Sequence, residues 1–179
     1  MKLSENRGTE ADATKTVARV LFLLVAALAL VFGQGAFAED AAGQGNSAAP
    51  ISVKTFDGVQ WSLAANKGRP VVVNFWASWC GPCNKEARSI EAAHRDFSAS
   101  GVEFIGIAVD DNESDVRQFV KEYGLTFPVA LDASGAVSSA YQIYGVPKTV
   151  IIGRDGRIKY THIGVITPEV LARELKKIL

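Results

Sequence analysis

The stretch Phe75-Trp76-Ala77-Ser78-Trp79-Cys80-Gly81-Pro82-Cys83 joins two segments whose hydrophobic residues follow different periods. Before it, residues 71–75 carry no charge and are rich in β-branched side chains, which predicts a buried central strand. After it the spacing becomes helical, with an apolar stripe of Ala87, Ile90 and Phe97 and, off that stripe, the charged residues Lys85, Arg88, Glu91 and Arg95. The two cysteines are therefore expected at a turn between a strand and a helix.

Cys80 and Cys83 are the only cysteines of the chain, and such a turn suits a reactive thiol. The unpaired backbone N–H groups and the dipole at a helix start favour negative charge, and the thiolate is the nucleophilic form of cysteine. Two intervening residues keep the sulfurs close enough to close a small ring. The spacing predicts a redox-active dithiol.

Other uses of a Cys-x-x-Cys pair fit this sequence less well. A structural disulfide across two residues would constrain the unfolded chain very little. A structural zinc site needs four ligands, and no second cysteine pair or His-x-His cluster supplies them. A c-type haem site needs histidine directly after the second cysteine, where Asn84 stands.

Length and composition allow one packed domain with additional segments. The chain has 179 residues, 48% of them hydrophobic, and a formal net charge of zero. Because no basic field is present, nucleic acid is not an expected partner.

The first 38 residues have the pattern of a signal peptide or membrane anchor. A polar segment with basic residues precedes the uncharged apolar run 20–32, and Ala36-Phe37-Ala38 is a cleavage pattern before Glu39. The run is shorter than the roughly 20 residues of a spanning helix, but the long polar segment keeps an uncleaved membrane tether through residues 20–32 open. Both alternatives place the domain outside the cytosol, in the periplasm or anchored to the inner membrane.

Residues 39–50 are rich in Ala, Gly, Asn and Ser and predict a flexible tether. The folded domain is expected from Ile51 to Leu179. It starts with a β-hairpin, because apolar segments 53–56 and 59–63 flank the turn Asp57-Gly58.

The segment after the cysteine helix predicts a parallel strand and a second helix. Residues 102–109 read as a buried strand, which makes a β-α-β unit. The acid-rich segment 110–115 lacks the calcium-loop pattern and is interpreted as a capped helix start. The further expected elements are a helix ending at Gly124, an edge strand at 127–131, a helix at 137–144, a hairpin of 148–152 and 157–163, and a last helix from Thr167-Pro168-Glu169.

This order of elements, with Trp-Cys-Gly-Pro-Cys and Gly145-Val146-Pro147, resembles the thioredoxin fold over residues 51–179. The helix-plus-strand insertion between Asp110 and Tyr144 resembles the exported TlpA/ResA-type branch, which includes cytochrome c maturation reductases. The expected fold is therefore an α/β thioredoxin fold with an N-terminal β-hairpin and a central insertion.

The resemblance implies three catalytic residues. Cys80 is the nucleophile, because it lies nearer the helix end and solvent, and Cys83 is the resolving thiol. Glu86 matches the acidic residue that this branch places one turn beyond the second cysteine; without the resemblance it would read as a solvated helix residue.

It also implies a partner-binding site. Pro147 aligns with the cis-proline of the family, and Val146 before it offers backbone hydrogen bonds to the partner chain. Without the resemblance, the Val146–Pro147 bond would be expected to be trans. Trp79, next to Cys80, shapes the partner groove.

Two positions depart from thioredoxin. Asn74 stands where thioredoxin has a titrating Asp, and the exported branch shares this Asn. Arg88 stands where the family usually has a proline, so a straighter helix is expected.

The expected activity is thiol-disulfide exchange that reduces exported partner proteins, such as apocytochrome c. The protein is expected to be a monomer, and a membrane electron donor is expected to reduce it again after each reaction. No organic cofactor or metal is needed. Two alternatives stay open: copper delivery through Cys80, Cys83 and His94 or His162, and a thiol peroxidase, although the chain lacks the Thr/Ser-rich peroxidatic loop.

Overall fold

The computed structural model of the chain describes residues 45–179. The predicted signal or anchor segment 1–38, with its apolar run 20–32, lies outside the described residues. Among the helices formed by residues 45–179, none combines the length and apolarity that crossing a membrane requires.

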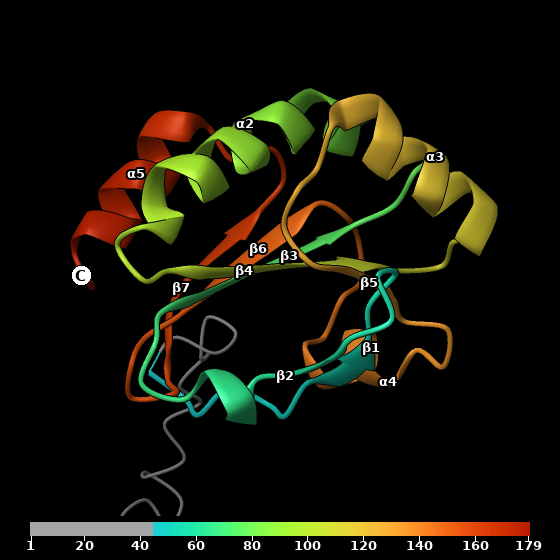
Figure 1. The fold of residues 1–179 in the computed structure, drawn as a ribbon. Helices are drawn as coiled ribbons and strands as arrows, with labels where there is room; N and C mark the ends of the chain where they lie inside the picture. Colours follow the sequence, from blue (N-terminus) through green and yellow to red (C-terminus); the bar gives the residue numbers. More distant parts are fainter. Residues whose placement is uncertain (1–44) are drawn as a thin grey trace, which may run out of the picture. The chain divides into compact units, whose positions relative to one another are not determined.

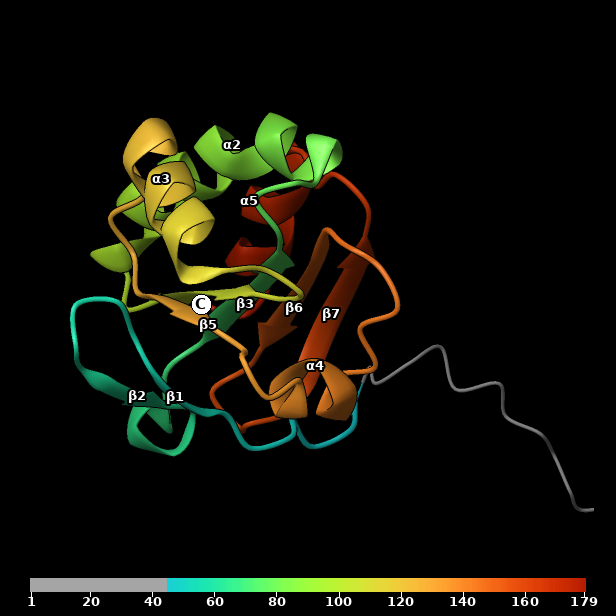
Figure 2. The ribbon, with the colours of Figure 1, turned by 90° about the vertical axis from the view of Figure 1, so that its right-hand side faces the viewer.

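A five-stranded mixed sheet forms the centre of the described domain (Figures 1 and 2). Its strand order is β5-β4-β3-β6-β7, in which β4 and β5 run parallel to the central β3, β6 runs antiparallel to β3, and β7 runs antiparallel to β6. The strands are β3 (Val71–Trp76), β4 (Glu103–Ala108), β5 (Val129–Leu131), β6 (Lys148–Ile152) and β7 (Ile158–Ile163).

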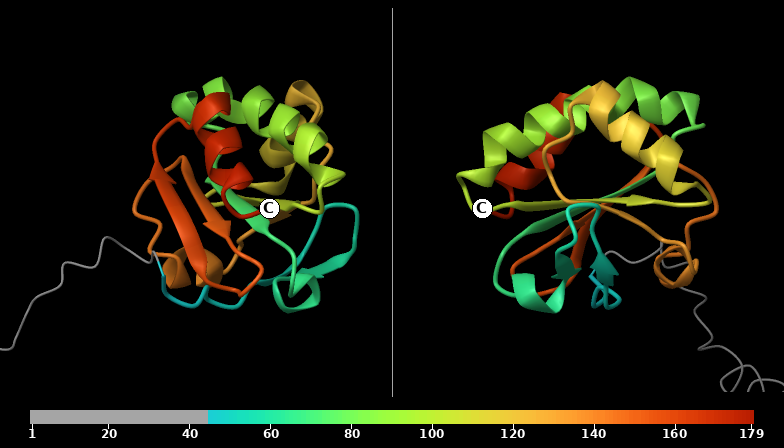
Figure 3. Two further views of the ribbon diagram at one scale, coloured as in Figure 1. Left: turned by 90° about the vertical axis from the view of Figure 1, so that its left-hand side faces the viewer. Right: turned by 45° about the vertical axis from the view of Figure 1, so that its right-hand side comes forward.

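The two faces of the sheet carry different elements (Figures 1 and 3). One face is covered by α2 (Gly81–Ser98), α3 (Glu113–Tyr123) and α5 (Pro168–Lys176). The other carries the hairpin of β1 (Ser52–Lys54) and β2 (Gln60–Ser62), the 3-10 turn η1 (Ala64–Asn66) and α4 (Ala136–Ala140). The predicted thioredoxin fold with an N-terminal hairpin and a helix-plus-strand insertion, here α3 and β5, is confirmed.

The alternation of side chains along β3 places one polar side chain, that of Asn74, beneath α2. Successive strand residues point to opposite faces, and all six residues of β3 are buried. Val72 and Trp76 belong to the apolar cluster under α2, whereas Val71, Val73 and Phe75 belong to the cluster on the opposite face. Asn74 therefore lies on the α2 face, inside the core.

The insertion is fixed to the core through Trp76. Its ring stacks on Phe119 of α3 with the ring centroids 4.2 Å apart. Gly106 of the neighbouring strand leaves the room for this ring, because a Cβ atom there would lie 2.9 Å from Trp76 Nε1. The acid-rich segment starts α3 as predicted, since the side chain of Asn112 accepts a hydrogen bond from Asp115 N.

The ordered domain begins before Ile51, so the predicted tether 39–50 is too long at its C-terminal end. Gly45 N donates to Ile158 O at 2.8 Å, Ile158 N donates to Asn46 O at 2.9 Å, and Ala48 N donates to Gly156 O at 2.9 Å. These bonds pair the segment with the β6–β7 hairpin. Because all three bonds are made by backbone groups, they do not depend on residue type, and the Ala- and Gly-rich composition of the segment does not predict them.

One further expectation was wrong in detail, and one buried charge was not foreseen. The helix predicted over 137–144 is the shorter α4, because Gln142 has a left-handed φ of 51°. Glu91, a charged residue off the apolar stripe of α2, is also buried: its carboxylate accepts hydrogen bonds from Thr126 N at 2.8 Å and Thr126 Oγ1 at 2.7 Å. The loop before β5 folds over α2 and supplies these donors.

Candidate active site

The two cysteines form a disulfide at the N-terminus of α2. Cys80 is the N-cap residue, and Cys83 N donates to Cys80 Sγ at 3.1 Å. Cys80 is 4% exposed and Cys83 is 1% exposed. After reduction, the same amide and the helix dipole would stabilise a thiolate at Cys80, the cysteine nearer solvent.

The loop before β6 lies beside this disulfide. The Val146–Pro147 peptide bond is cis, as the resemblance implied. Val146 O lies 3.6 Å from Cys80 Sγ, and Gly164 N donates to Pro147 O at 2.8 Å. The backbone of Val146 is thus next to the sulfur that a partner would reach.

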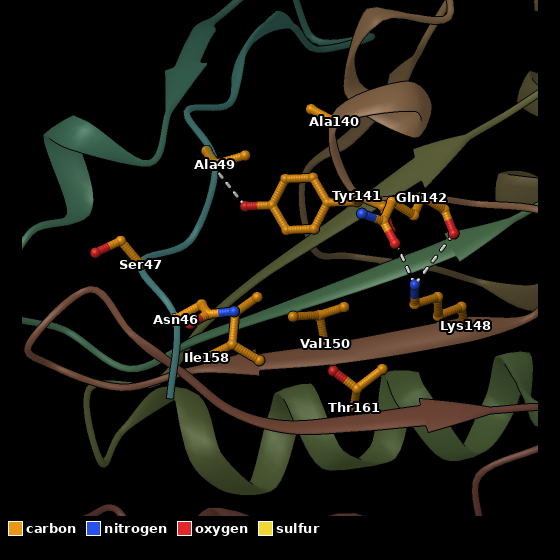
Figure 4. A pocket seen from close by; sticks show the side chains of 10 residues that line it. All are labelled: Asn46, Ser47, Ala49, Ala140, Tyr141, Gln142, Lys148, Val150, Ile158 and Thr161. Atoms are coloured by element: carbon orange, nitrogen blue, oxygen red, sulfur yellow. Dashed lines mark hydrogen bonds between the residues drawn. The ribbon is translucent and has the colours of Figure 1, made fainter. Parts of the chain in front are cut away.

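Lys148 anchors this loop from the opposite face of the sheet (Figure 4). Its buried Nζ donates to Tyr141 O at 2.8 Å and to Gln142 O at 3.3 Å, at the end of α4. Burial lowers the pKa of this ammonium. The contacts border a cavity of about 260 Å³, and they tie the chain before Val146 to the start of β6.

Glu86 is buried beneath the helix start, with 1% of its surface exposed. Asn74 Nδ2 donates to Glu86 Oε1 at 2.9 Å, and Ile166 N donates to Glu86 Oε2 at 2.8 Å. Burial raises the pKa of Glu86, while these two hydrogen bonds and the charge of His162 act in the opposite direction. Glu86 follows Cys83 by three residues and shares its helix face.

Arg88 stands where the family usually has a proline, and α2 runs unbroken from Gly81 to Ser98. Its guanidinium lies 5.6 Å from the ring centroid of Tyr123 on α3. The burial of Glu86 therefore does not depend on a proline at this position.

Asp111 is a site residue that sequence reasoning missed. Its carboxylate accepts hydrogen bonds from Ser78 N at 2.6 Å and from Ser78 Oγ at 2.9 Å, while Trp79 Nε1 donates to Asp110 O at 2.9 Å. A signal existed: β3 and β4 are parallel neighbours, so the residues that follow both strands meet at one sheet edge. The carboxylate holds the loop that presents Trp79 and Cys80.

Replacing this carboxylate should impair partner reduction without removing the thiols. We expect Asp111→Ala to slow the reduction of a protein disulfide about tenfold, because the loop before Cys80 loses its fixed position. Asp96→Ala, at an exposed carboxylate of α2, is the control and should match wild type. Insulin reduction rates measure the effect, and equal rates for the two variants would contradict this role of Asp111.

Exposed apolar side chains lie on the segments around the disulfide and the cis-proline. Trp79 is 64% exposed and Tyr144 is 93% exposed. Ile163 and Val165 flank Gly164, whose amide binds Pro147 O, and both are also exposed. Sequence reasoning identified Trp79 and Val146 here but not Tyr144, Ile163 or Val165, because an isolated apolar residue in a loop carries no local pattern.

The two histidines have different surroundings. His94 packs edge-on against Phe104 and Phe127, with centroid distances of 5.3 and 5.7 Å. His162 contacts Tyr160 Oη and Val165 O. Within residues 45–179, no group of three or more His, Cys, Asp or Glu side chains is placed to hold a metal ion.

Comparisons with known proteins agree with this geometry. The Redoxin family model matches residues 44–179. The thiol-disulfide oxidoreductase ResA of Bacillus thuringiensis (strain Al Hakam) is 35% identical over 160 residues, which cover 89% of this chain and 92% of that protein.

Two solved structures extend the comparison. A thiol:disulfide interchange protein of the thioredoxin family from Chlorobium tepidum TLS has a TM-score of 0.69 at 28% identity, covering 78% of this chain and 98% of that one. StoA from Bacillus subtilis has a TM-score of 0.64 at 30% identity, covering 72% of this chain and 97% of that one.

Proposed function

The chain belongs to the redoxin family and is a ResA-type thiol-disulfide oxidoreductase of the thioredoxin superfamily, and from this premise we propose that it reduces disulfides of exported partner proteins. The observation that carries the proposal is the Cys80–Cys83 disulfide at a helix N-terminus with the Cys83 amide aimed at Cys80 Sγ. That amide favours the thiolate on the cysteine that lies beside the Val146–Pro147 backbone.

The reaction starts from the reduced pair. The Cys80 thiolate attacks one sulfur of the partner's disulfide; a Cys80–partner bond forms, and the other partner sulfur leaves as a thiolate and takes up a proton. Cys83 then loses its proton and attacks Cys80 Sγ. The second partner sulfur leaves and is protonated, so two electrons and two protons pass from the dithiol to the partner.

Glu86 accepts the proton of Cys83 in this scheme. Asn74, the polar residue of β3 under α2, has no titratable group, so it can only orient the carboxylate. A buried carboxylate with a raised pKa is a better proton acceptor and donor near neutral pH than a solvated one. The two cysteines carry both electrons, and the exchange needs no organic cofactor or metal.

The reducing direction and the exported location rest on the sequence. The Cys-Gly-Pro-Cys spacer is that of thioredoxin, whose potential of about −270 mV is reducing. The apolar run 20–32 and the pattern ending at Ala38 support export, with the segment either cleaved or kept as an anchor. The domain acts as a monomer, receives electrons from a membrane donor and serves cytochrome c biogenesis by reducing apocytochrome c.

Partner capture in the native cell envelope tests this assignment. Cys83→Ser cannot resolve the mixed disulfide, so we expect this variant to retain partner proteins until dithiothreitol releases them. The retained proteins should contain cysteines that form a disulfide when oxidised. The double variant Cys80→Ser/Cys83→Ser is the matched control and should retain none. If the double variant retains the same proteins, or apocytochrome c is absent from the Cys83→Ser set, the proposed exchange or its proposed partner is wrong.

A further inference from the structure

His162 lies at the solvent-facing edge of a polar cluster formed by Glu86, Asn74 and Thr149. It pairs with Thr149 across β6 and β7, and directly opposite residues of an antiparallel pair share a face of the sheet. Thr149 Oγ1 accepts a hydrogen bond at 3.1 Å from Asn74 Nδ2, which also donates to Glu86. His162 is half-buried, while Glu86, Asn74 and Thr149 are buried.

The contacts of His162 define its neutral tautomer. Nε2 lies 3.1 Å from Val165 O, and because a carbonyl oxygen only accepts, Nε2 carries a proton. Nδ1 lies 3.2 Å from Tyr160 Oη, and a hydroxyl can donate to a bare nitrogen or accept from a protonated one. Both ring nitrogens of His162 therefore have a partner, one on β7 and one in the loop that follows β7.

A single peptide group connects His162 to Glu86. The carbonyl of the Val165–Ile166 peptide accepts from His162 Nε2, and the N–H of the same peptide donates to Glu86 Oε2 at 2.8 Å. Hydrogen bonds arranged in series polarise one another, so a charge on the imidazole strengthens the bond at the carboxylate. The positive charge of His162 also lowers the pKa of Glu86 directly, against the larger effect of burial.

We propose that His162 is a positioning residue that acts on Glu86 through the Val165–Ile166 peptide. It holds the peptide N–H on the carboxylate, and its positive charge extends to lower pH the range in which Glu86 accepts the proton of Cys83. The inference rests on the proposed function for its catalytic consequence, but the coupling between the two side chains is measurable without it.

The direction of the effect follows from the groups that face the cluster. Cys83 and Glu86 come from α2 and Tyr160 from β7, while Asn74 of β3 and Thr149 of β6 do not titrate. Removing the positive charge of His162 takes away one of the effects that lower the pKa of Glu86, while burial continues to raise this pKa. Glu86 then stays protonated to a higher pH, where it cannot accept a proton.

Carboxyl ¹³C NMR titration of Glu86 in the disulfide form tests the coupling directly. His162→Gln removes the charge but keeps a side-chain N–H for Val165 O, and His162→Lys keeps both a charge and a donor. We expect the Glu86 midpoint to rise in His162→Gln and to stay lower in His162→Lys than in His162→Gln. His94→Gln, at the other histidine of the chain, is the control and should match wild type. Identical midpoints for wild type and His162→Gln would overturn the proposal, whatever the protein reduces.

Stopped-flow measurement of the resolution step against pH tests the consequence. In His162→Gln the rate should fall about three- to tenfold on the acidic side and converge on wild type at alkaline pH. In a Glu86→Gln background the same substitution should have no further effect, because its target is gone. A loss of equal size at every pH, or one that persists without Glu86, would show that His162 only supports the fold. If Cys80 and Cys83 instead reduced no protein disulfide, the NMR result would stand while the proposed function fell.

Discussion

Cys80→Ser is expected to lower protein-disulfide reduction to the rate measured without the protein. Serine cannot form or exchange a disulfide bond, and Cys83 lies three residues further into the first turn of α2, without the amide that Cys80 Sγ receives. Cys83→Ser should lose turnover as well but stop at a different point, as a stable mixed disulfide on Cys80. Dithiothreitol-coupled insulin reduction gives the rates, and intact mass gives the trapped species.

Both serine variants should keep the fold, since each replaces a sulfur by a smaller oxygen within an unchanged helix start. Matching thermal unfolding against reduced wild type is the control. Substantial turnover by Cys80→Ser would show that Cys83 can start the exchange, and the assignment of the two roles would be wrong.

Glu86→Gln is expected to slow resolution of the mixed disulfide about ten- to a hundredfold near neutral pH. The loss is smaller than for either cysteine, because water can still accept the proton. The slow step should also lose its acidic limb, since no carboxylate remains to titrate. Stopped-flow rates against pH for wild type and Glu86→Gln measure this, and superimposable profiles would show that Glu86 takes no part in the proton transfer.

The same variant has a thermodynamic consequence with a defined sign. Burial raises the pKa of Glu86 in the folded state, so the folded protein binds this proton more tightly than the unfolded chain does. The stability that the protonated group contributes is present at acidic pH and is lost as pH rises through its folded pKa. Wild type should therefore lose stability relative to Glu86→Gln between acidic and neutral pH, in thermal unfolding of the disulfide forms.

The sequence predicted the elements that are encoded locally. The uncharged run into Trp76 became β3, the helical spacing after Cys83 became α2, and Thr167-Pro168 starts α5 as expected. Each of these rests on periodicity or capping within a few residues. The roles and positions of Glu86 and Pro147 came from the family resemblance, because a helix Glu and a loop Pro are ambiguous alone.

The features that were missed depend on contacts between distant segments. Glu91 is buried because Thr126, 35 residues away, donates to it, and Asp111 holds Ser78 from 33 residues away. The segment from residue 45 is ordered by backbone bonds to the β6–β7 hairpin. Neither the hydrophobic periodicity nor the composition of a short segment indicates which distant residue will contact it. The predicted parallel pairing of β3 and β4 could, however, have pointed to Asp111.

Pulse alkylation of the reduced protein tests the central claim most directly. Brief exposure of folded, reduced wild type to iodoacetamide at neutral pH, followed by acid quenching and peptide mapping, reports which thiol is the thiolate. Because the Cys83 amide and the helix dipole favour negative charge on Cys80 Sγ, the first label should appear on Cys80, with Cys83 modified only in unfolded protein. Equal labelling of both cysteines in the native fold, or earlier labelling of Cys83, would contradict the account.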